Sequence, residues 1–319
     1  MKTLANPKTK ESLAFGGQAL IEGVMMRSRK HMVMCVRNPK KEIVTSVENL
    51  NPLGERYKAL GVPFIRGIVM LFESFYMGMK ALFFSANTAL EDPEAEAKDK
   101  AEAETENGKP GKDEGKTFGF GEIAVVGAAA LGMVAVFFLV PFLLAGWLNP
   151  TGLGWVFNVI EAVIRLSMFI GYLALISRWG EFRRVLQYHG AEHKAINAYE
   201  AGVPMDVEHV KKHSRLHPRC GTSFLFIVLI ISIVLFTIMP DFGFYWKIAY
   251  RIMLIPVIAG ISYELLRLSG KYRNSPVTKV LTAPGMGFQL LTTKEPTDDM
   301  LEVSIKAVQE VTKLSVATA

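Results

Sequence analysis

The sequence predicts an α-helical membrane protein of about four transmembrane helices with a small cytoplasmic α+β part. Half of the 319 residues are hydrophobic and the mean hydropathy is positive, which favours a membrane protein with polar parts over two soluble domains. Several apolar stretches approach the roughly 20 residues that cross a bilayer, and charged segments separate them. The predicted parts are a β-rich cytoplasmic segment (1–54), an interfacial helix (55–90), a disordered charged linker (91–117), transmembrane helices 1 and 2 (118–177), a cytoplasmic histidine-rich helical hairpin (178–222), transmembrane helices 3 and 4 (223–270) and a C-terminal cytoplasmic segment (271–319).

The first part consists of short β-prone runs that polar or proline residues interrupt, as at Asn38-Pro39. This pattern predicts a small antiparallel meander. Glu22 lies within an apolar run, where an unpaired carboxylate is costly. We expect it to pair with a cation such as Arg27 or Arg66; membership of a functional site is the alternative.

The interfacial helix is predicted from its charge spacing. Arg66, Glu73 and Lys80 recur every seven residues among apolar ones, so a helix carries them on one face. Three charges are costly inside a bilayer, whereas an amphipathic helix lying on the membrane tolerates them. Residues 91–117 that follow are charged and rich in Ala, Gly and Pro, which is typical of a disordered tether.

Four apolar stretches beyond the linker predict the transmembrane helices. The second of them contains Glu161 and Arg165, four residues apart, which can pair inside the bundle. This pair is equally compatible with a structural latch and with a functional role. The stretches are 123–148, 155–176, 224–239 and 246–268.

The basic residues predict the orientation. The connection between the second and third stretches carries eight Lys and Arg residues, whereas residues 149–154 and 240–245 carry none. The positive-inside rule then places both termini and the histidine-rich segment in the cytoplasm, in a multi-pass protein of the plasma membrane. Because the basic residues flank apolar runs, we expect the lipid bilayer as a partner and no nucleic acid.

A histidine cluster is the strongest functional signal. Five of the six histidines lie between residues 189 and 217. His189 and His193 are four apart, so they share a helix face with Glu192 beside them. In this H-x-x-E-H order two imidazoles hold a metal and the carboxylate can act as a base on bound water. His217 and Cys220 offer further nitrogen and sulfur ligands, so we expect Zn²⁺ or another divalent transition metal.

A helical hairpin is predicted to assemble these residues. The first helix spans about 181–200 and ends before Gly202, and Asp206 is a plausible N-cap for a second, short helix through His213. The hairpin would return His217 and Cys220 to the first helix. Glu264, at the cytoplasmic end of the fourth span, is a possible additional ligand or outer-shell partner. His209 and His213 lie among basic residues, and we expect them to cap helices or face lipid headgroups.

The C-terminal segment is predicted to contain two further elements. Residues 281–296 suggest turns plus one strand that joins the N-terminal meander. Thr297 or Asp298 then caps an amphipathic helix whose apolar stripe we expect in the core. The stripe consists of Met300, Leu301, Val303, Ile305, Val308 and Val311.

Several motifs together resemble the YqhQ family. They are Gly-Gly-Gln-Ala-Leu-Ile-Glu-Gly-Val-Met-Met-Arg (16–27), Tyr-His-Gly-Ala-Glu-His-Lys (188–194) and His-Pro-Arg-Cys-Gly-Thr-Ser-Phe (217–224), with shorter matches at 284–285 and 291–296. The similarity extends over about residues 14–315. This is a family of bacterial membrane proteins of uncharacterised function, commonly labelled predicted metal-dependent enzymes. The resemblance therefore implies the architecture and a metal site, but no reaction; His189, Glu192, His193, His217 and Cys220 all fall within its motifs.

Two classes of function fit these observations. The first is a metal-dependent hydrolase at the membrane surface, in which His189 and His193 bind the metal and Glu192 is catalytic. The second is a non-catalytic accessory protein with a structural metal and a membrane-protein partner, for example in protein export or membrane quality control. Four protein ligands would leave no position for water, which favours the second class, whereas the carboxylate between the two imidazoles favours the enzyme. Gly190 inside the motif helix lowers helix stability, which counts against the first class. A transporter is disfavoured, because four spans without a repeat make a thin pathway. The substrate and the oligomeric state do not follow from the sequence.

Overall fold

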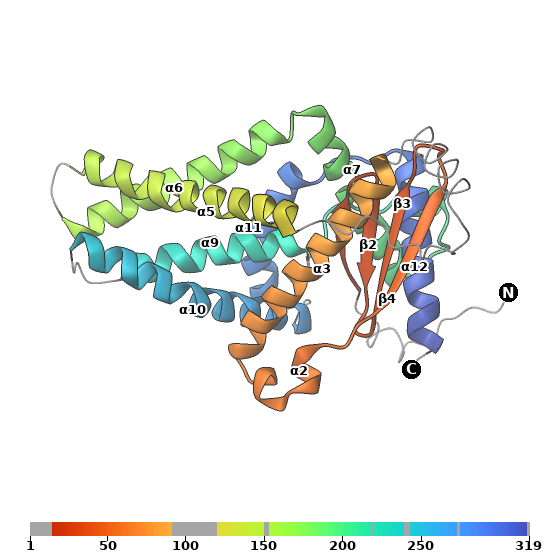
Figure 1. Cartoon of the computed structure of the whole chain (residues 1–319), viewed down its shortest axis with the longest axis horizontal. Coiled ribbons are helices and arrows are strands. Elements are labelled where there is room, and N and C mark those ends of the chain that lie inside the picture. The colour runs from red at the N-terminus through yellow and green to blue at the C-terminus, as the bar shows by residue number, and fades with distance from the viewer. Residues whose placement is uncertain are drawn as a thin grey trace, which may run out of the picture.

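The computed structural model describes residues 15–90, 120–149, 153–218, 220–238, 243–272 and 275–317. The chain forms a helical bundle at one end and a sheet covered by helices at the other (Figure 1). The sheet contains β1 (Gly16–Leu20), β2 (Gly23–Arg27), β3 (His31–Arg37) and β4 (Ile43–Asn49). The helices are α2 (Leu53–Arg56), a 3₁₀ turn η1 (Lys58–Gly61), α3 (Ile65–Leu90), α5 (Phe120–Leu148), α6 (Gly154–Ile176), α7 (Gly180–Ala201), α8 (Val207–Val210), α9 (Gly221–Thr237), α10 (Phe244–Lys271), α11 (Pro276–Thr292) and α12 (Asp298–Ala317). The predicted linker, 91–117, lies outside the described residues.

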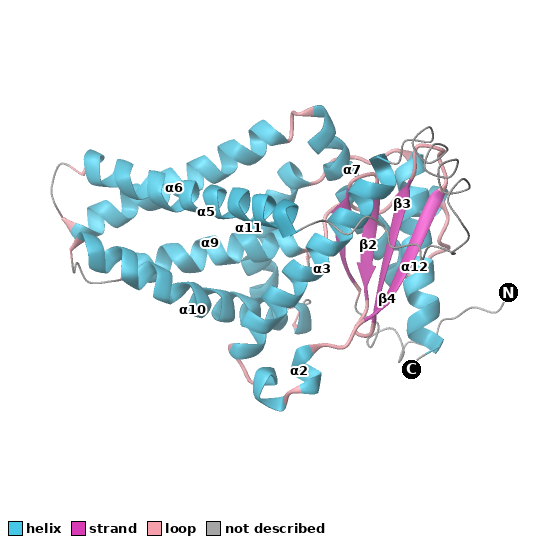
Figure 2. Ribbon diagram, in the orientation of Figure 1, coloured by secondary structure: helices cyan, strands magenta, loops and turns pink. Residues whose placement is uncertain are grey.

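The predicted meander is confirmed as a four-stranded antiparallel sheet in the order β1-β2-β3-β4 (Figure 2). Alternation of side chains along the strands buries both of its faces. Val24, Val33 and Cys35 pack with α7 and α12. Met25 and Met34, on the opposite face, pack with Met77 and Ala81 of α3. The apolar stripe predicted for the last helix is confirmed as core, because all six of its residues are buried on the α7 side.

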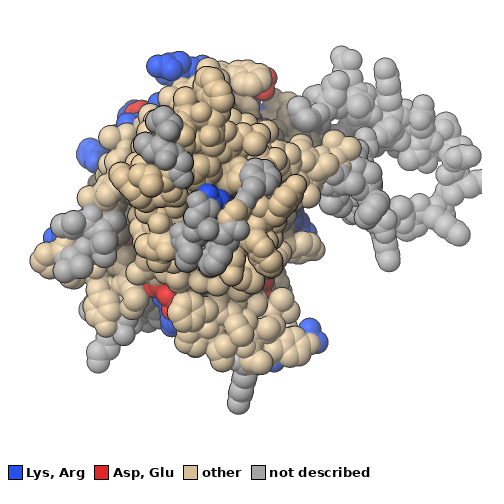
Figure 3. Space-filling view, turned by 90° about the vertical axis from the view of Figure 1, so that its left-hand side faces the viewer, with Lys and Arg blue, Asp and Glu red and all other residues tan. Residues whose placement is uncertain are grey.

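Four helices are long and apolar enough to cross a membrane, as predicted, but they are not the predicted four. They are 65–89, 127–148, 154–176 and 245–269. The helix α9, predicted as the third span, is apolar but only 17 residues long. Seen from the bundle end, the described residues show few charged side chains (Figure 3).

The three charges of α3 are compatible with its place among these four helices. Each of its three regularly spaced charges has a partner within the protein: Arg66 binds Glu264, Lys80 binds Glu48, and Glu73 accepts a hydrogen bond from the backbone N–H of Leu53. Internal partners offset much of the cost that charges add to an apolar helix. The composition of α3 therefore does not require the interfacial placement that the charge spacing suggested.

Two further predictions need correction. Residues 276–292 form the helix α11 instead of turns and a strand. Pro276 lies in its first turn, where proline suits a helix, and Gly285 allows close packing, since a Cβ there would lie 3.2 Å from Ser223 Oγ of α9. Glu22 is paired as expected, but with Arg184 of α7 (Nε–Oε1 2.6 Å) instead of Arg27 or Arg66. The partner is 162 residues away because α7 packs across β1 and β2.

Candidate metal centre

The two helices predicted as the scaffold of the candidate site are present, although the second, expected to extend through His213, ends at Val210. The helix α7 ends at Gly202, whose φ of +73° is the left-handed conformation that terminates many helices. Asp206 caps α8 as predicted, accepting a hydrogen bond from the backbone N–H of His209 (3.0 Å). The chain then returns along α7 and enters α9 at Cys220.

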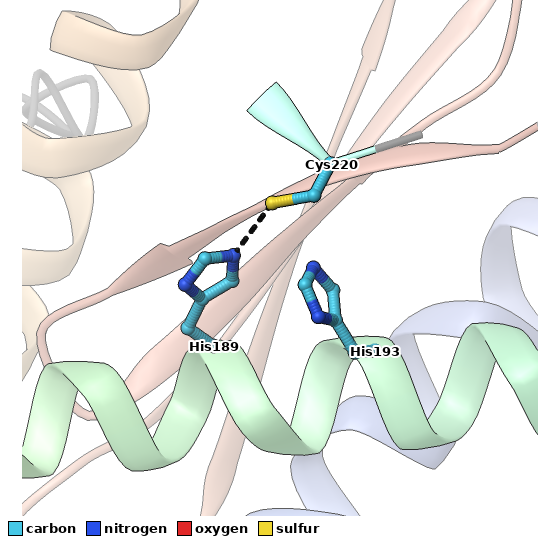
Figure 4. Close-up of side chains that lie close together, drawn as sticks. All are labelled: His189, His193 and Cys220. Carbon is cyan, nitrogen blue, oxygen red and sulfur yellow. Dashed lines mark hydrogen bonds between the residues drawn. The ribbon is translucent and has the colours of Figure 1, made fainter. Parts of the chain in front are cut away.

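Three side chains converge at this junction. His189 and His193 project from successive turns of α7, and Cys220 faces them from the start of α9 (Figure 4). Their candidate ligand atoms all lie within 4.8 Å of one another. Nε2 of His189 is 3.1 Å from the Cys220 sulfur. Two imidazole nitrogens and one thiolate sulfur are donors that Zn²⁺ accepts, so the group could hold such an ion.

Backbone carbonyl groups orient both imidazoles. Nδ1 of His189 is 2.8 Å from the carbonyl oxygen of Thr292, and Nδ1 of His193 is 2.6 Å from that of Arg215. A carbonyl oxygen only accepts, so each Nδ1 carries the proton and donates. Each Nε2 is then left with a lone pair directed to the cluster, the arrangement of metal-binding histidines.

The electrostatic environment also suits metal ligands. Burial lowers the pKa of His193 from its ordinary value, although hydrogen bonding to Cys220 partly opposes this shift. A low pKa keeps the imidazole neutral, as a ligand must be. Cys220 is the N-cap of α9, and its sulfur accepts a hydrogen bond from the backbone N–H of Thr222 (3.4 Å). The helix dipole favours negative charge at that position.

Glu192 is buried beside the group but outside it. Its side chain is 4% exposed, and among the described residues Oε2 has no hydrogen-bond partner. Burial raises its pKa, and the nearby His189 and His217 offset this only in part. The carboxyl group lies against the backbone of Gly17 in β1, where a Cβ would come within 2.4 Å of Oε1. Glu192, His189, His193 and Cys220 all line one cavity of about 500 Å³.

Two residues named as possible ligands are placed differently. His217 lines the same cavity but lies outside the group of three, with its Nε2 3.7 Å from Glu200 Oε1. Gln289 of α11 hydrogen-bonds both backbone polar groups of His217 and so fixes its position. Glu264 is held instead by the guanidinium of Arg66, with Nε–Oε1 at 2.7 Å, because α3 packs against α10.

Several contributors were missed by sequence reasoning. Thr292 and Arg215 orient the imidazoles through carbonyl oxygens, which every residue type has, so their side chains carry no signal. Gly17 and Gly190, in contrast, are visible in the sequence as glycines within a strand and a helix. Gly17 makes room for Glu192, and a Cβ at Gly190 would lie 2.1 Å from the carbonyl oxygen of Lys294. Gly190 therefore permits a close crossing of α7 by the segment that follows Thr292, which explains a glycine inside a helix.

Comparison with known proteins agrees with the motifs. A family model described as "Protein of unknown function (DUF1385)" matches residues 62–314, which include all three candidate ligands. The chain is 37% identical over 311 residues to the "Uncharacterized protein YqhQ" of Bacillus subtilis (strain 168), covering 96% of this chain and 95% of that protein. No solved structure matches. Neither description states a reaction, and the chain belongs to the family of YqhQ, DUF1385.

Proposed function

We propose that this protein is a metal-dependent hydrolase acting at the membrane surface. The observation that carries the proposal is the size of the ligand group, which has three members, His189, His193 and Cys220. Catalytic zinc sites keep three protein ligands and an open position for water, whereas structural sites are usually closed by four. The displacement of His217 from the group removes the main objection that the sequence raised against an enzyme.

The roles of the residues follow from their positions. A divalent ion such as Zn²⁺ would supply Lewis acidity and activate a water molecule. His189 and His193 are held by carbonyl oxygens in the tautomer that binds through Nε2. Glu192 lines the same cavity, and among the described residues its Oε2 has no hydrogen-bond partner, so it would accept the proton of the attacking water. Burial raises the pKa of Glu192, and a raised pKa makes a carboxylate a stronger general base.

The surroundings support a substrate that reaches the site from the membrane. The ligand Cys220 begins the apolar helix α9, and Leu225 of that helix also lines the cavity. A lipid-linked or membrane-protein substrate fits this border between apolar and polar surroundings. The positive-inside pattern of the basic residues supports a location on the cytoplasmic side of the plasma membrane.

A non-catalytic accessory protein is the second candidate, and one observation favours it. The ligands come from two helices, so a bound ion would also clamp α7 to the start of α9. In this version the metal stabilises a docking unit for a membrane-protein partner, and Glu192 has no chemical role.

Metal analysis of the detergent-purified protein is the first test. We expect about one equivalent of zinc in the wild type, lost in His189→Ala and Cys220→Ala because each removes one of three ligands. Glu192→Gln and His217→Ala are expected to retain it. His213→Ala, outside the group, is a matched histidine control. Wild-type protein without metal, or metal retained after loss of Cys220, would contradict the proposed centre.

Activity then separates the two candidates. The protein is assayed against fluorogenic ester, amide and phosphoester substrates in mixed micelles. The hydrolase predicts turnover that Glu192→Gln lowers by roughly 10²–10⁴-fold while metal content and melting temperature stay unchanged. If Glu192→Gln keeps full turnover, the assigned base is wrong. A metal-loaded protein without turnover, whose melting temperature falls on metal removal, would support the clamp.

A further inference from the structure

A second, larger cavity lies between the sheet and the bundle. Its volume is about 850 Å³. The turn between β2 and β3 forms one wall, and the segment through α2 and η1 forms another. The start of α3 and the end of α10 complete it, in the region where α2 projects from the molecule in Figure 1.

The side chains that line this cavity carry a net positive charge. One carboxylate lines it, that of Glu55, and it pairs with the exposed Arg29. Arg66 is neutralised by Glu264 just outside the cavity. Neither Arg27 nor Arg267 has a hydrogen bond or ion pair with another side chain among the described residues. The five cations lining the cavity are Arg27, Arg29, Lys30, Arg66 and Arg267.

Two nitrogen-bearing side chains on the sheet side of the cavity, the half-buried Arg27 and the buried His31, are incompletely paired. Burial lowers the pKa of Arg27, and the distant attraction of Glu73 offsets this only partly. His31 is 5% exposed and lines the cavity, and its Nδ1 has no hydrogen-bond partner within the described part of the chain. Buried polar nitrogen atoms are normally hydrogen-bonded, so this one leaves a hydrogen-bonding position of His31 unused beside the cavity.

The cavity borders apolar surface on two sides. Phe64 and Ile65, at the start of α3, are 53% and 44% exposed. Leu268, one residue beyond Arg267 on α10, is 49% exposed. Both helices are long and apolar enough to cross a membrane. A basic cavity beside such surface resembles the boundary between lipid headgroups and acyl chains.

We propose that this cavity binds a phosphate group, with Arg27 and Arg267 as its principal cationic partners and His31 as a further hydrogen-bonding group. Guanidinium groups match phosphate oxygens in geometry and charge. An anionic phospholipid headgroup and a free phosphate ion share this chemistry; the flanking apolar side chains add contacts that only the lipid can use. The binding does not depend on the proposed hydrolase.

Two residues connect this cavity with the metal centre. Gly16 and Arg27 line both cavities, so a phosphate held at Arg27 would lie at the border between them. The metal ligands themselves line only the smaller cavity, which allows the two sites to be tested separately.

The test is a lipid titration of the delipidated full-length protein, followed by native mass spectrometry. The probes are phosphatidylglycerol, diacylglycerol with the same acyl chains, and inorganic phosphate. We expect phosphatidylglycerol to bind at least about tenfold more tightly than diacylglycerol, because charge-assisted hydrogen bonds contribute at least that factor. If inorganic phosphate competes with phosphatidylglycerol, the site binds phosphate and the free ion is a ligand. If phosphatidylglycerol binds without such competition, the site binds phosphate as part of a lipid headgroup.

The variants assign the site to its residues. Arg27→Gln and Arg267→Gln are each expected to weaken phosphatidylglycerol binding about tenfold. Arg267 is exposed, so its replacement leaves the fold intact even if that of Arg27 does not. Arg183→Gln, a basic residue of α7 outside the cavity, is expected to bind as the wild type does, and so is His189→Ala. Equal binding of the two lipids, or unchanged binding in Arg267→Gln together with a folded Arg27→Gln, would overturn the proposal.

Discussion

At the scale of single residues, the close packing of α7 against the segment after α11 depends on Gly190, which has no side chain. Gly190 lies on α7 between His189 and His193. The segment after α11 crosses the helix at that point. Lys294 donates its backbone N–H to the carbonyl oxygen of Leu186 (2.8 Å). This crossing also holds the carbonyl group of Thr292 against His189.

Gly190→Ala is expected to destabilise the protein. Alanine favours a helix by about 1 kcal/mol over glycine, but its Cβ would lie 2.1 Å from the carbonyl oxygen of Lys294, so a backbone must move. We expect a net loss of about 1–3 kcal/mol, measured as a lower melting temperature, together with weaker metal retention. Gly180→Ala, at the start of the same helix in open space, is the control and should be neutral or stabilising. An unchanged Gly190→Ala melting temperature would show that the crossing is not tight.

Cys35 gives a prediction about pH. It is fully buried in β3, and burial raises the pKa of its thiol above the ordinary value of 9.0, although the hydrogen bond to Thr45 partly opposes this. The folded state therefore keeps its proton at a pH where the unfolded state loses it. The corresponding stability is fully present below about pH 9 and is lost as the pH rises through the folded-state pKa, by up to about 1.4 kcal/mol per pH unit.

The comparison that tests this is wild type against Cys35→Val, of similar volume. Melting temperatures are measured from about pH 7 to pH 10.5. The wild type should lose stability relative to the variant only above about pH 9. Parallel curves would mean that the thiol does not titrate differently in the two states.

At the scale of elements, a charged triad joins α6 and α10, and an aromatic ring of α9 packs on it. Glu161 of α6 forms ion pairs with Arg165 on the same helix and with Arg251 of α10, and all three side chains are buried. Phe236 of α9 stacks on both guanidinium groups, with ring centroids at 5.5 Å and 5.1 Å. The predicted pair of Glu161 and Arg165 is thus confirmed. Arg251, which lies 90 positions from Glu161 in the sequence, is a second arginine partner.

Glu161→Ala should strongly destabilise the bundle. It leaves two buried guanidinium groups without their carboxylate, and breaking a buried ion pair in this way costs about 3–5 kcal/mol. The measurement is the melting temperature in detergent, with the exposed Glu181→Ala as control. Combining Glu161→Leu with Arg165→Met and Arg251→Met tests the purpose of the triad. A stable, metal-binding triple variant that keeps its activity would identify a structural latch, whereas a stable, metal-binding variant without activity would indicate a functional role.

At the scale of the whole molecule, the metal centre lies where the sheet unit meets the bundle. Two ligands belong to α7, which packs on the sheet, and the third begins α9, which belongs to the bundle. The larger cavity lies at the same border. Both candidate sites therefore occupy the level at which a bilayer surface would meet the sheet unit.

Cysteine labelling tests this orientation. In intact cells, Leu153→Cys, in the loop before α6, should react with a membrane-impermeant maleimide, whereas Lys212→Cys, after α8, should react only after permeabilisation. Basic loops stay in the cytoplasm, and residues 149–154 carry no Lys or Arg. The native Cys35 and Cys220 are buried, so the wild type measures the background. Labelling of Lys212→Cys from outside would reverse the topology.

The sequence by itself determined the features that depend on neighbouring residues. Short β-prone runs between polar and proline residues predicted the meander, and helix-ending residues predicted the extent of α7. An apolar stripe predicted α12, and the spacing of four predicted that His189 and His193 share a face. These predictions hold because the geometry of one strand or helix fixes which of its residues lie together. The H-x-x-E-H order named Glu192 as a candidate, and the three-residue spacing from His217 named Cys220.

Only the tertiary structure decided which distant residues meet. It selected Cys220 over His217 as the third member of the ligand group, paired Glu264 with Arg66, and gave Glu22 the partner Arg184. It also showed that α11 is a helix, because packing against α9 outweighed the turn propensity of its glycines and of Pro284. Local spacing cannot settle such contacts, because they depend on how helices and sheet pack across long stretches of chain.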